Sequence, residues 1–334
     1  MILIRADANE VVGTGHVMRC LSIARAILNN GVKVKFVTAD HRADSFIIRA
    51  GIDVICLESK FDEMDDELSR LMEIIDEERP EMLLVDSYYV TEVYFEALSA
   101  TVKTAYMDDL NLSTWDVDYL INYNIFAAIY DYSGYQNKKT HLILGPQYVP
   151  LREDFANIPH REINDRVTSV LISAGGSDPE QVLERIIRDI CFKWPEITFH
   201  CVVGALNPRI EKIKKLTSDH IVLHINEQNM AELMIKCDIA ISAAGTTLYE
   251  LCAVGLPTIT YSLADNQIIA TEQFETQGIM LNAGDCRNNI GFMSRMEELL
   301  IMLCNSRERR DTLSRRTQNL VDGKGTIRIA EILL

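Results

Sequence analysis

The sequence lacks the features that mark several common classes of protein. Its eight cysteines, Cys56 among them, include no C-x-x-C pair and lie mostly inside apolar strand or helix patterns. We therefore expect reduced core residues, and neither metal ligands nor disulfides. No uninterrupted apolar run is long enough to span a bilayer, so no integral membrane segment is expected. The start of the chain shows no basic n-region and no cleavable apolar segment, which favours a cytoplasmic protein.

Positive charge is also scarce. The 33 lysines and arginines face 49 aspartates and glutamates, which gives a formal net charge of −16. Such a chain repels nucleic acid, so we expect no nucleic-acid partner, and any bound phosphate must be met locally by backbone amides and a few basic side chains. The apolar content of 48% and the length of 334 residues are typical of a globular protein with two domains.

The first half of the chain alternates short apolar runs with helical patterns, which predicts an α/β fold with a parallel sheet covered on both faces. Strands are expected over residues 2–5, 33–37, 54–57, 82–85, 104–107 and 119–121, and helices over 16–29, 44–50, 64–77 and 92–99. The acidic stretch over residues 62–78 is interpreted as the solvated face of a helix.

A second βα series follows a break in the pattern. The predicted division is an N-terminal domain over residues 1–150, a linker over 151–165 and a C-terminal domain over 166–334. Strands of the second series are expected over residues 169–173, 198–203, 221–224, 239–242, 258–261 and 279–281. Both halves look Rossmann-like, and two such domains are expected to face each other across a cleft at the carboxyl ends of their strands.

The loop Gly13-Thr14-Gly15-His16 follows the first strand and precedes a helix. Met18 stands where the dinucleotide fingerprint requires a third glycine, and the loop has no lysine followed by Ser or Thr, which disfavours Rossmann dinucleotide and P-loop sites. The glycines allow a sharp turn and a close approach to phosphate. Histidine titrates near neutral pH, so His16 is placed for acid–base chemistry. The alternative is that His16 only caps or packs the helix.

Two loops of the second half suit a diphosphate. Gly175 and Gly176 form a backbone nest before a helix, where Asp178 is either part of the nest or the N-cap of that helix. Ser242, Gly245, Thr246 and Thr247 end a strand and open another helix. Glu250 either holds ribose hydroxyls or forms a capping box with Thr247.

Together these motifs resemble the PseG family, the UDP-2,4-diacetamido-2,4,6-trideoxy-β-L-altropyranose hydrolases, and related spore-coat polysaccharide biosynthesis proteins. The similarity covers nearly the whole chain. It rests on Arg5-Ala6-Asp7, Gly13-Thr14-Gly15-His16, Arg19, Asp86-Ser87-Tyr88, Asp108-Asp109, the segment 148–155, Gly175-Gly176-Ser177-Asp178, the segment 229–234 and the segment 242–250.

The resemblance implies a GT-B-like fold and hydrolysis of a UDP-linked diacetamido-trideoxy sugar in pseudaminic-acid-type biosynthesis, with His16 as the catalytic base. It implies substrate binding by Arg5, Asp7, Gly13, Gly15, Tyr88, Asp108 and Arg152, and UDP binding by Gly175, Gly176, Asn229, Ser242, Gly245, Thr246, Thr247 and Glu250. The chain departs from the family at Tyr249, where some members carry an amide side chain.

No cofactor or catalytic metal is expected. The chain has no Asp-x-Asp motif beside these loops, and adjacent Asp108 and Asp109 in an extended segment would point in opposite directions. Either aspartate orients His16 or binds sugar hydroxyls, or the pair only marks a turn. Two other functions stay open: a glycosyltransferase that passes the sugar to an acceptor, and a nucleotide-sugar binding protein without catalysis. The expected partner is a small-molecule UDP-sugar. The sequence leaves the oligomeric state open, and a monomer is compatible with it.

Overall fold

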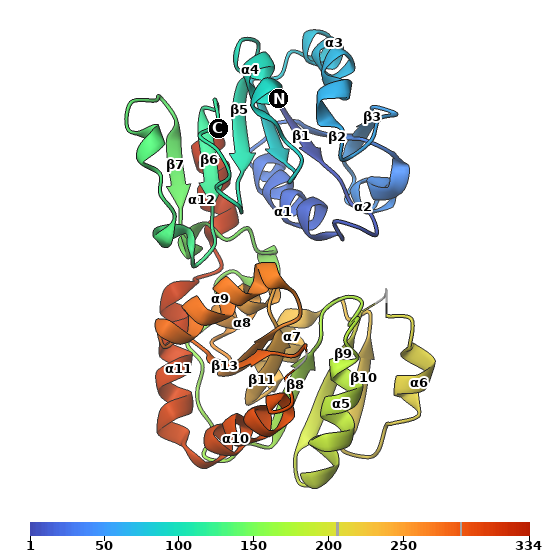
Figure 1. Cartoon of the computed structure of the whole chain (residues 1–334), viewed down its shortest axis with the longest axis vertical. Coiled ribbons are helices and arrows are strands. Elements are labelled where there is room, and N and C mark those ends of the chain that lie inside the picture. Colours follow the sequence, from blue (N-terminus) through green and yellow to red (C-terminus); the bar gives the residue numbers. More distant parts are fainter. Residues whose placement is uncertain (205–206, 288) are drawn as a thin grey trace. The chain divides into compact units, whose positions relative to one another are not determined.

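The computed structural model describes residues 1–204, 207–287 and 289–334. The chain divides into two compact units, one made of Met1–Glu153 with Lys324–Leu334 and the other of Asp154–Gly323 (Figure 1). Each unit is built on one parallel sheet. This confirms the predicted α/β class with two Rossmann-like halves.

The first unit holds a seven-stranded parallel sheet in the order β3-β2-β1-β4-β5-β6-β7. The central strands β1 and β4 are buried at every residue, as expected for parallel strands covered on both faces. The strands are β1 (Ile2–Ala6), β2 (Val34–Thr38), β3 (Asp53–Cys56), β4 (Met82–Asp86), β5 (Lys103–Met107), β6 (Tyr119–Asn122) and β7 (His141–Leu144). The sequence pattern did not predict β7, a short strand with both of its first residues exposed.

The helices of the first unit follow the predicted positions closely. They are α1 (Gly15–Asn29), α2 (Asp44–Arg49), α3 (Leu68–Glu78), α4 (Glu92–Ser99) and α12 (Gly325–Leu333). Helix α1 ends where Gly31 adopts a φ of +78°, a conformation that glycine adopts without strain. The predicted helix from residue 64 begins instead as a 3₁₀ turn, η2 (Met64–Glu67), followed by α3.

The second unit holds a six-stranded parallel sheet in the order β10-β9-β8-β11-β12-β13. Its strands are β8 (Ser169–Ser173), β9 (Thr198–Val203), β10 (Ile221–Ile225), β11 (Ile239–Ala243), β12 (Thr258–Ser262) and β13 (Leu281–Asp285). Its helices are α5 (Val182–Asp189), α6 (Ile210–Lys214), α7 (Met230–Lys236), α8 (Thr247–Val254), α9 (Asp265–Thr276), α10 (Phe292–Asn305) and α11 (Arg307–Leu320).

Strand β13 begins later than predicted. The amides of Ile279 and Met280 bond back to the carbonyl of Phe274, at 2.8 and 3.2 Å, and so close the end of α9. Those two residues are therefore used by the helix terminus, and the strand starts only at Leu281.

The domain boundaries differ from the predicted ones at two places. The C-terminal helix α12 packs against α1 and belongs to the first unit, whereas the second domain was predicted to run to residue 334. A Cβ at Gly325 would lie 2.2 Å from the carbonyl oxygen of Val149, and the hydroxyl of Thr326 donates to the carbonyl of Leu151 at 2.6 Å. These contacts hold the start of the predicted linker within the first unit, which ends at Glu153.

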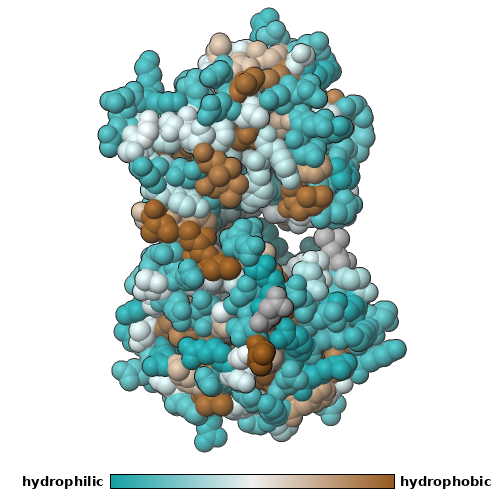
Figure 2. All heavy atoms as spheres, in the orientation of Figure 1, coloured by the Kyte–Doolittle hydropathy of each residue, from teal (hydrophilic) through white to brown (hydrophobic). Residues whose placement is uncertain are grey.

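Within the described residues, the structure has no helix long and apolar enough to cross a membrane, which agrees with the prediction of no membrane-spanning segment. In the view of Figure 2, hydrophilic residues cover most of the visible surface of each unit.

Both sheets contain a topological switch point, where the chain leaves two neighbouring strands toward opposite sides. In the first unit this point lies between β1 and β4, with Ala6 paired to Asp86. In the second unit it lies between β8 and β11, with Ser173 paired to Ser242. Open α/β sheets bind ligands outside the carboxyl ends of such strands.

Candidate active site

His16 stands at the switch point of the first unit, on the second residue of α1. The preceding loop is closed by two backbone hydrogen bonds between Asn9 and Gly13, of 3.2 and 2.8 Å, and Gly13 has a φ of +71°. This turn brings the chain from the end of β1 to the start of α1 in a few residues. The His16 side chain is 5% exposed and faces the end of β4.

The imidazole of His16 is oriented by Asp86, the last residue of β4. His16 Nδ1 lies 2.6 Å from Asp86 Oδ1. Arg19 Nη2 lies 3.2 Å from the same nitrogen, but the carboxylate contact is shorter, so we assign the Nδ1 proton to the bond with Asp86. In the neutral imidazole, Nε2 then carries a lone pair that can accept a proton.

Arg19 keeps Asp86 ionised. Its guanidinium donates through Nε to Oδ2 at 2.6 Å and through Nη2 to Oδ1 at 2.5 Å. Burial raises the pKa of Asp86, but the charges and hydrogen bonds of Arg19 and His16 outweigh burial and hold the pKa below its usual range. A buried carboxylate that stays charged can stabilise an imidazolium on His16 when the latter takes up a proton.

A second carboxylate, Asp109, lies on the other side of Arg19. Arg19 Nη1 donates to Asp109 Oδ2 at 2.8 Å and to the hydroxyl of Tyr123 at 2.7 Å. The hydroxyl of Tyr88 also donates to Asp109, at 3.2 Å, and its ring meets the His16 ring edge-on with centroids 4.5 Å apart. Burial, followed by the charge of Asp109, raises the pKa of Tyr88, so Tyr88 stays a hydroxyl donor.

Two of the residues predicted to bind substrate serve the fold instead. Arg5 is fully buried and bonds through Nε and Nη2 to both carboxylate oxygens of Glu67, at 2.7 and 2.8 Å, and through Nη1 to Asp7 at 2.5 Å. Arg5 therefore positions Asp7 and offers no surface to a ligand. Glu67, expected on a solvated helix face, is the buried partner that makes this arrangement possible.

Asp108 is the second such residue. Its carboxylate accepts the amides of Leu110 and Asn111, at 3.0 and 2.8 Å, and the indole N–H of Trp115 at 3.2 Å. These bonds build the turn after β5 and leave Asp108 only 1% exposed. The turn interpretation of Asp108 is therefore correct, while Asp109 points the opposite way, toward Arg19.

A small pocket lies beside His16 within the first unit. It is lined by Asp7, Val12, His16, Phe61, Asp86, Ser87, Tyr88 and Tyr89. Asp7 and Tyr88, two of the predicted substrate residues, therefore share a pocket with His16, and Gly13 and Gly15 flank it in sequence. Arg152 is half-buried on the segment next to Leu151. Because Asp86 and Asp109 both face the positive charge of Arg19, the cluster is poorly suited to hold a cation.

The switch point of the second unit has a different chemistry. Gly175 and Gly176 follow β8 and are exposed, and Gly175 has a φ of +78°. A Cβ at Gly204, the residue after β9, would lie 2.2 Å from the carbonyl oxygen of Gly176. Glycine is thus required at position 204 for the close approach of the loops after β8 and β9. The sequence around Gly204 does not show this role, because Gly176 is its neighbour only in the folded chain.

The loop after β11 presents small residues at the start of α8. Gly245 and Thr246 are exposed, and a Cβ at Gly245 would meet no protein atom of the described residues within 4 Å. At the start of α8 the amides of Leu248 and Tyr249 already donate to the carbonyls of Gly245 and Thr246, each at 3.0 Å, so donors to a ligand have to come from the amides before Leu248. Ser242, predicted to bind UDP, is instead buried in β11 and donates to the carbonyl of Ala243 at 3.0 Å.

The structure also places three further residues considered for this unit. Asp178 caps α5, since its carboxylate accepts the amides of Val182 and Leu183 at 2.8 and 3.2 Å. The amide of Glu250 bonds to the carbonyl of Thr246 at 3.4 Å, and both roles considered for its side chain stay predictions. Asn229 is exposed and precedes α7, which packs against α8.

Comparison with known proteins finds one matching protein family and several similar curated proteins. Residues 170–287 match the glycosyltransferase family 28 C-terminal domain. The spore coat polysaccharide biosynthesis protein SpsG of Bacillus subtilis is 29% identical over 201 residues, which cover 58% of this chain and 56% of SpsG. The UDP-2,4-diacetamido-2,4,6-trideoxy-β-L-altropyranose hydrolase of Campylobacter jejuni is 26% identical over 254 residues, covering 75% of this chain and 86% of that protein.

These relatives confirm the resemblance drawn from the motifs. The chain spans about half the length of SpsG and of two other curated relatives that it matches. Among solved structures, MurG of Acinetobacter baumannii superimposes with a TM-score of 0.73 at 12% identity, over 99% of this chain and 98% of MurG. That likeness confirms the fold, the two-unit GT-B-like architecture.

Proposed function

We propose that this chain hydrolyses a UDP-linked 2,4-diacetamido-2,4,6-trideoxy sugar to the free sugar and UDP, as a step of pseudaminic-acid-type biosynthesis. The observation that carries the proposal is the bond of 2.6 Å between His16 Nδ1 and the buried, ionised Asp86. The name of the Campylobacter jejuni relative supports the substrate and the reaction. A binding protein without catalysis has no need of an oriented imidazole at this position.

His16 acts as the general base in the proposed reaction. Its Nε2 takes a proton from a water molecule while the water oxygen bonds to the anomeric carbon of the sugar. The bond between that carbon and the UDP oxygen breaks, and UDP leaves with the bonding electron pair. Asp86 stabilises the imidazolium that forms, and Arg19 holds Asp86 in place by two hydrogen bonds.

The second unit holds UDP in this proposal. Both exposed loops, at Gly175–Gly176 and Gly245–Thr246, follow neighbouring strands of the switch point and lie within the stretch that matches the glycosyltransferase domain. Backbone amides and the positive end of the α8 dipole offset the charge of the diphosphate. UDP is then a stable leaving group, so the proposal includes no metal ion and no general acid.

A glycosyltransferase is the second candidate, and the family 28 domain match favours it. The test is NMR of the whole chain incubated with UDP-2,4-diacetamido-2,4,6-trideoxy-β-L-altropyranose, with and without a saccharide acceptor. We expect free sugar and UDP at the same rate in both samples. UDP that appears only with the acceptor would support the transferase, and no turnover in either sample would leave a binding protein as the interpretation.

A further inference from the structure

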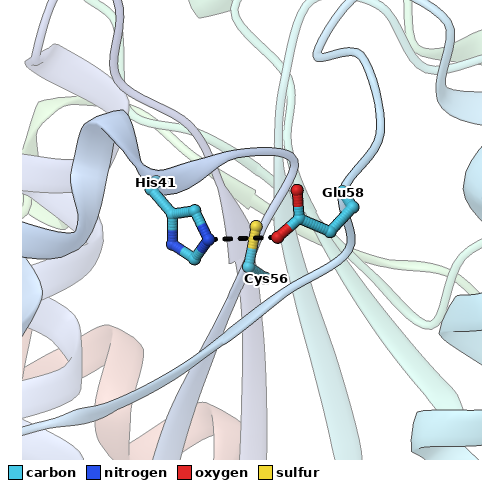
Figure 3. Close-up of side chains that lie close together, drawn as sticks. All are labelled: His41, Cys56 and Glu58. Atoms are coloured by element: carbon cyan, nitrogen blue, oxygen red, sulfur yellow. Dashed lines mark hydrogen bonds and ion pairs between the residues drawn. The ribbon is translucent and has the colours of Figure 1, made fainter.

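A second cluster of chemically active side chains lies outside the His16 pocket, at the carboxyl ends of β2 and β3. His41 opens η1 (His41–Ala43) shortly after β2, Cys56 is the last residue of β3, and Glu58 follows two positions later. Figure 3 shows the three side chains turned toward one another from these two segments. The strands are paired at this end, with Thr38 opposite Cys56.

The three ligand atoms are close enough to share one ion. His41 Nε2 lies 3.0 Å from Glu58 Oε1, and one atom each of His41, Cys56 and Glu58 lies within 4.8 Å of the other two. Nitrogen, sulfur and oxygen ligands of tetrahedral zinc bind at about 2.0–2.3 Å, which separates them by roughly 3.3–3.8 Å. The observed separations therefore require only small side-chain movements to accept an ion.

His41 is already held in the orientation of a metal ligand. Its other ring nitrogen, Nδ1, lies 2.6 Å from Asp44 Oδ2. Without an ion, Nε2 donates to Glu58 at 3.0 Å, and an ion would take the place of that proton between Nε2, Cys56 and Glu58. Zinc-binding histidines almost always donate their other ring N–H to a carboxylate, a backbone carbonyl or a water, which fixes the tautomer.

The backbone on both sides of Glu58 is also fixed. The amide of Leu57 donates to the carbonyl of Thr38 and the amide of Ser59 donates to the carbonyl of Ala39, each at 2.9 Å. These bonds tie the segment after β3 to the segment after β2. The ligands thus come from two segments whose separation is set by the sheet.

We propose that His41, Cys56 and Glu58 bind a zinc-class divalent ion, with water at the fourth position. The donor set of one imidazole, one thiolate and one carboxylate selects zinc over magnesium or calcium, which prefer oxygen ligands alone. The His41 and Glu58 side chains are 66% and 76% exposed, so the ion has a path from solvent. The expectation that every cysteine is a core residue is wrong for Cys56, which is half-exposed.

An ion bound at this site would hold in place the two segments, after β2 and after β3, that border the His16 pocket. The amide of Ala39 donates to Asp7 at 2.7 Å, and Phe61, three residues after Glu58, lines that pocket. The ion belongs to neither the sugar nor the diphosphate in the proposed reaction. Its expected effect is therefore on the stability of the first unit and not on the chemical step.

The test is titration of the tag-free, metal-stripped full chain with Zn²⁺ by calorimetry and with Co²⁺ by absorption spectroscopy. We expect one ion per chain and, with Co²⁺, a thiolate-to-cobalt charge-transfer band. Cys56→Ser should abolish the band and weaken Zn²⁺ binding by more than the roughly 10- to 100-fold that loss of an outer-shell partner costs. Asp44→Asn should keep the band but weaken binding within that range.

Cys304→Ser is the matched control, because Cys304 is the other half-exposed cysteine of the described residues and lies in the second unit. This variant should bind both ions as the wild type does, and circular dichroism should be the same for all variants. Binding that is unchanged in a folded Cys56→Ser protein, or a wild type that binds no stoichiometric Zn²⁺, would overturn the proposal.

Discussion

The two switch points have the same topology and opposite chemistry. In the first unit, the end of β4 presents Asp86 and the start of α1 presents His16 and Arg19, all of them buried. In the second unit, the strand ends at β8 and β11 present exposed glycines and hydroxyls around Gly175 and Gly245. In the proposed function, the residues at the first switch point transfer a proton and those at the second bind the diphosphate.

The difference is also electrostatic. Arg19 lies between two carboxylates, so the charges of the first site are paired and serve to fix the imidazole. The loops at Gly175 and Gly245 offer neutral amides, whose dipoles complement a diphosphate without competing carboxylates. We therefore expect substitutions at the first switch point to change turnover and substitutions at the second to change affinity.

The largest expected effect comes from His16→Asn. Removing a positioned general base lowers turnover by roughly 10²- to 10⁴-fold. UDP affinity, measured by calorimetry, should stay within about twofold of wild type, because the loops proposed to bind UDP lie in the other unit. Turnover close to wild type in a folded His16→Asn protein would remove His16 from the mechanism and end the proposed division of roles.

Asp86→Asn tests how much the buried ion pair between Asp86 and Arg19 contributes to the free energy of unfolding. The substitution leaves Arg19 without its buried partner, and breaking a buried ion pair destabilises a protein by about 3–5 kcal/mol. Urea unfolding of wild type and variant at neutral pH measures this loss. Asp109→Asn is the comparison, because Asp109 is less buried and should cost less. Equal stability of Asp86→Asn and wild type would contradict the interpretation of Asp86 as an ionised, paired group.

The pH dependence of the stability of the first unit follows from the lowered pKa of Asp86. Its stabilising contribution is complete above the unfolded value of about 3.9 and is lost as pH falls toward the lower folded value. The stability difference between wild type and Asp86→Asn should therefore be constant from neutral pH down to about pH 5 and shrink in stronger acid. Unfolding measured across this range tests the sign, and a gap that widens on acidification would refute it.

A smaller effect is expected at the second switch point. Gly245→Val puts a branched side chain into open space above the loop, where no protein atom of the described chain interferes but a diphosphate would. UDP affinity should fall by about tenfold or more, which corresponds to about 1.4 kcal/mol. Gly291→Val is the matched control, an exposed glycine before α10 with similar space. Equal affinities in the two variants would place UDP elsewhere.

The smallest effect on activity is expected from chelation. EDTA should leave turnover within about twofold of its starting value, because the proposed reaction meets charge with amides and helix dipoles. If the cluster of His41, Cys56 and Glu58 holds an ion, EDTA should instead lower the melting temperature. Activity that is lost with EDTA and restored by Mg²⁺ would contradict both the metal-free mechanism and the contrast between the two sites.

Much of the fold was predictable because parallel strands carry a continuous apolar pattern. The six strands predicted in each half of the chain are present in the structure. Strand β7 was missed because it has four residues, two of them exposed, and its sequence resembles that of a loop. The position of α12 was not predictable. The apolar face of α12 could pack against a helix of either unit. Only the contacts of Gly325 and Thr326 with the segment at residues 149–151 show that α12 joins the first unit.

The candidate site was predictable only in part. Local motifs predict His16 and Tyr88 as site residues, because glycines and a strand end mark their positions, and the structure brings the two side chains together. Asp86, the partner of His16, lies 70 positions further along the chain, and local spacing does not reveal this pairing. Arg5 and Asp108 sit in matching motifs, yet the structure uses both for buried contacts that a motif cannot distinguish from ligand contacts.

Hydrolysis in ¹⁸O-labelled water tests the central claim most directly, because it reports which atom the water attacks. The full chain is incubated with UDP-2,4-diacetamido-2,4,6-trideoxy-β-L-altropyranose, and both products are analysed at once by mass spectrometry. If His16 activates water against the anomeric carbon while the second unit holds UDP, the label appears in the sugar and UDP stays unlabelled. Label in the β-phosphate of UDP would show attack at phosphorus and contradict this account.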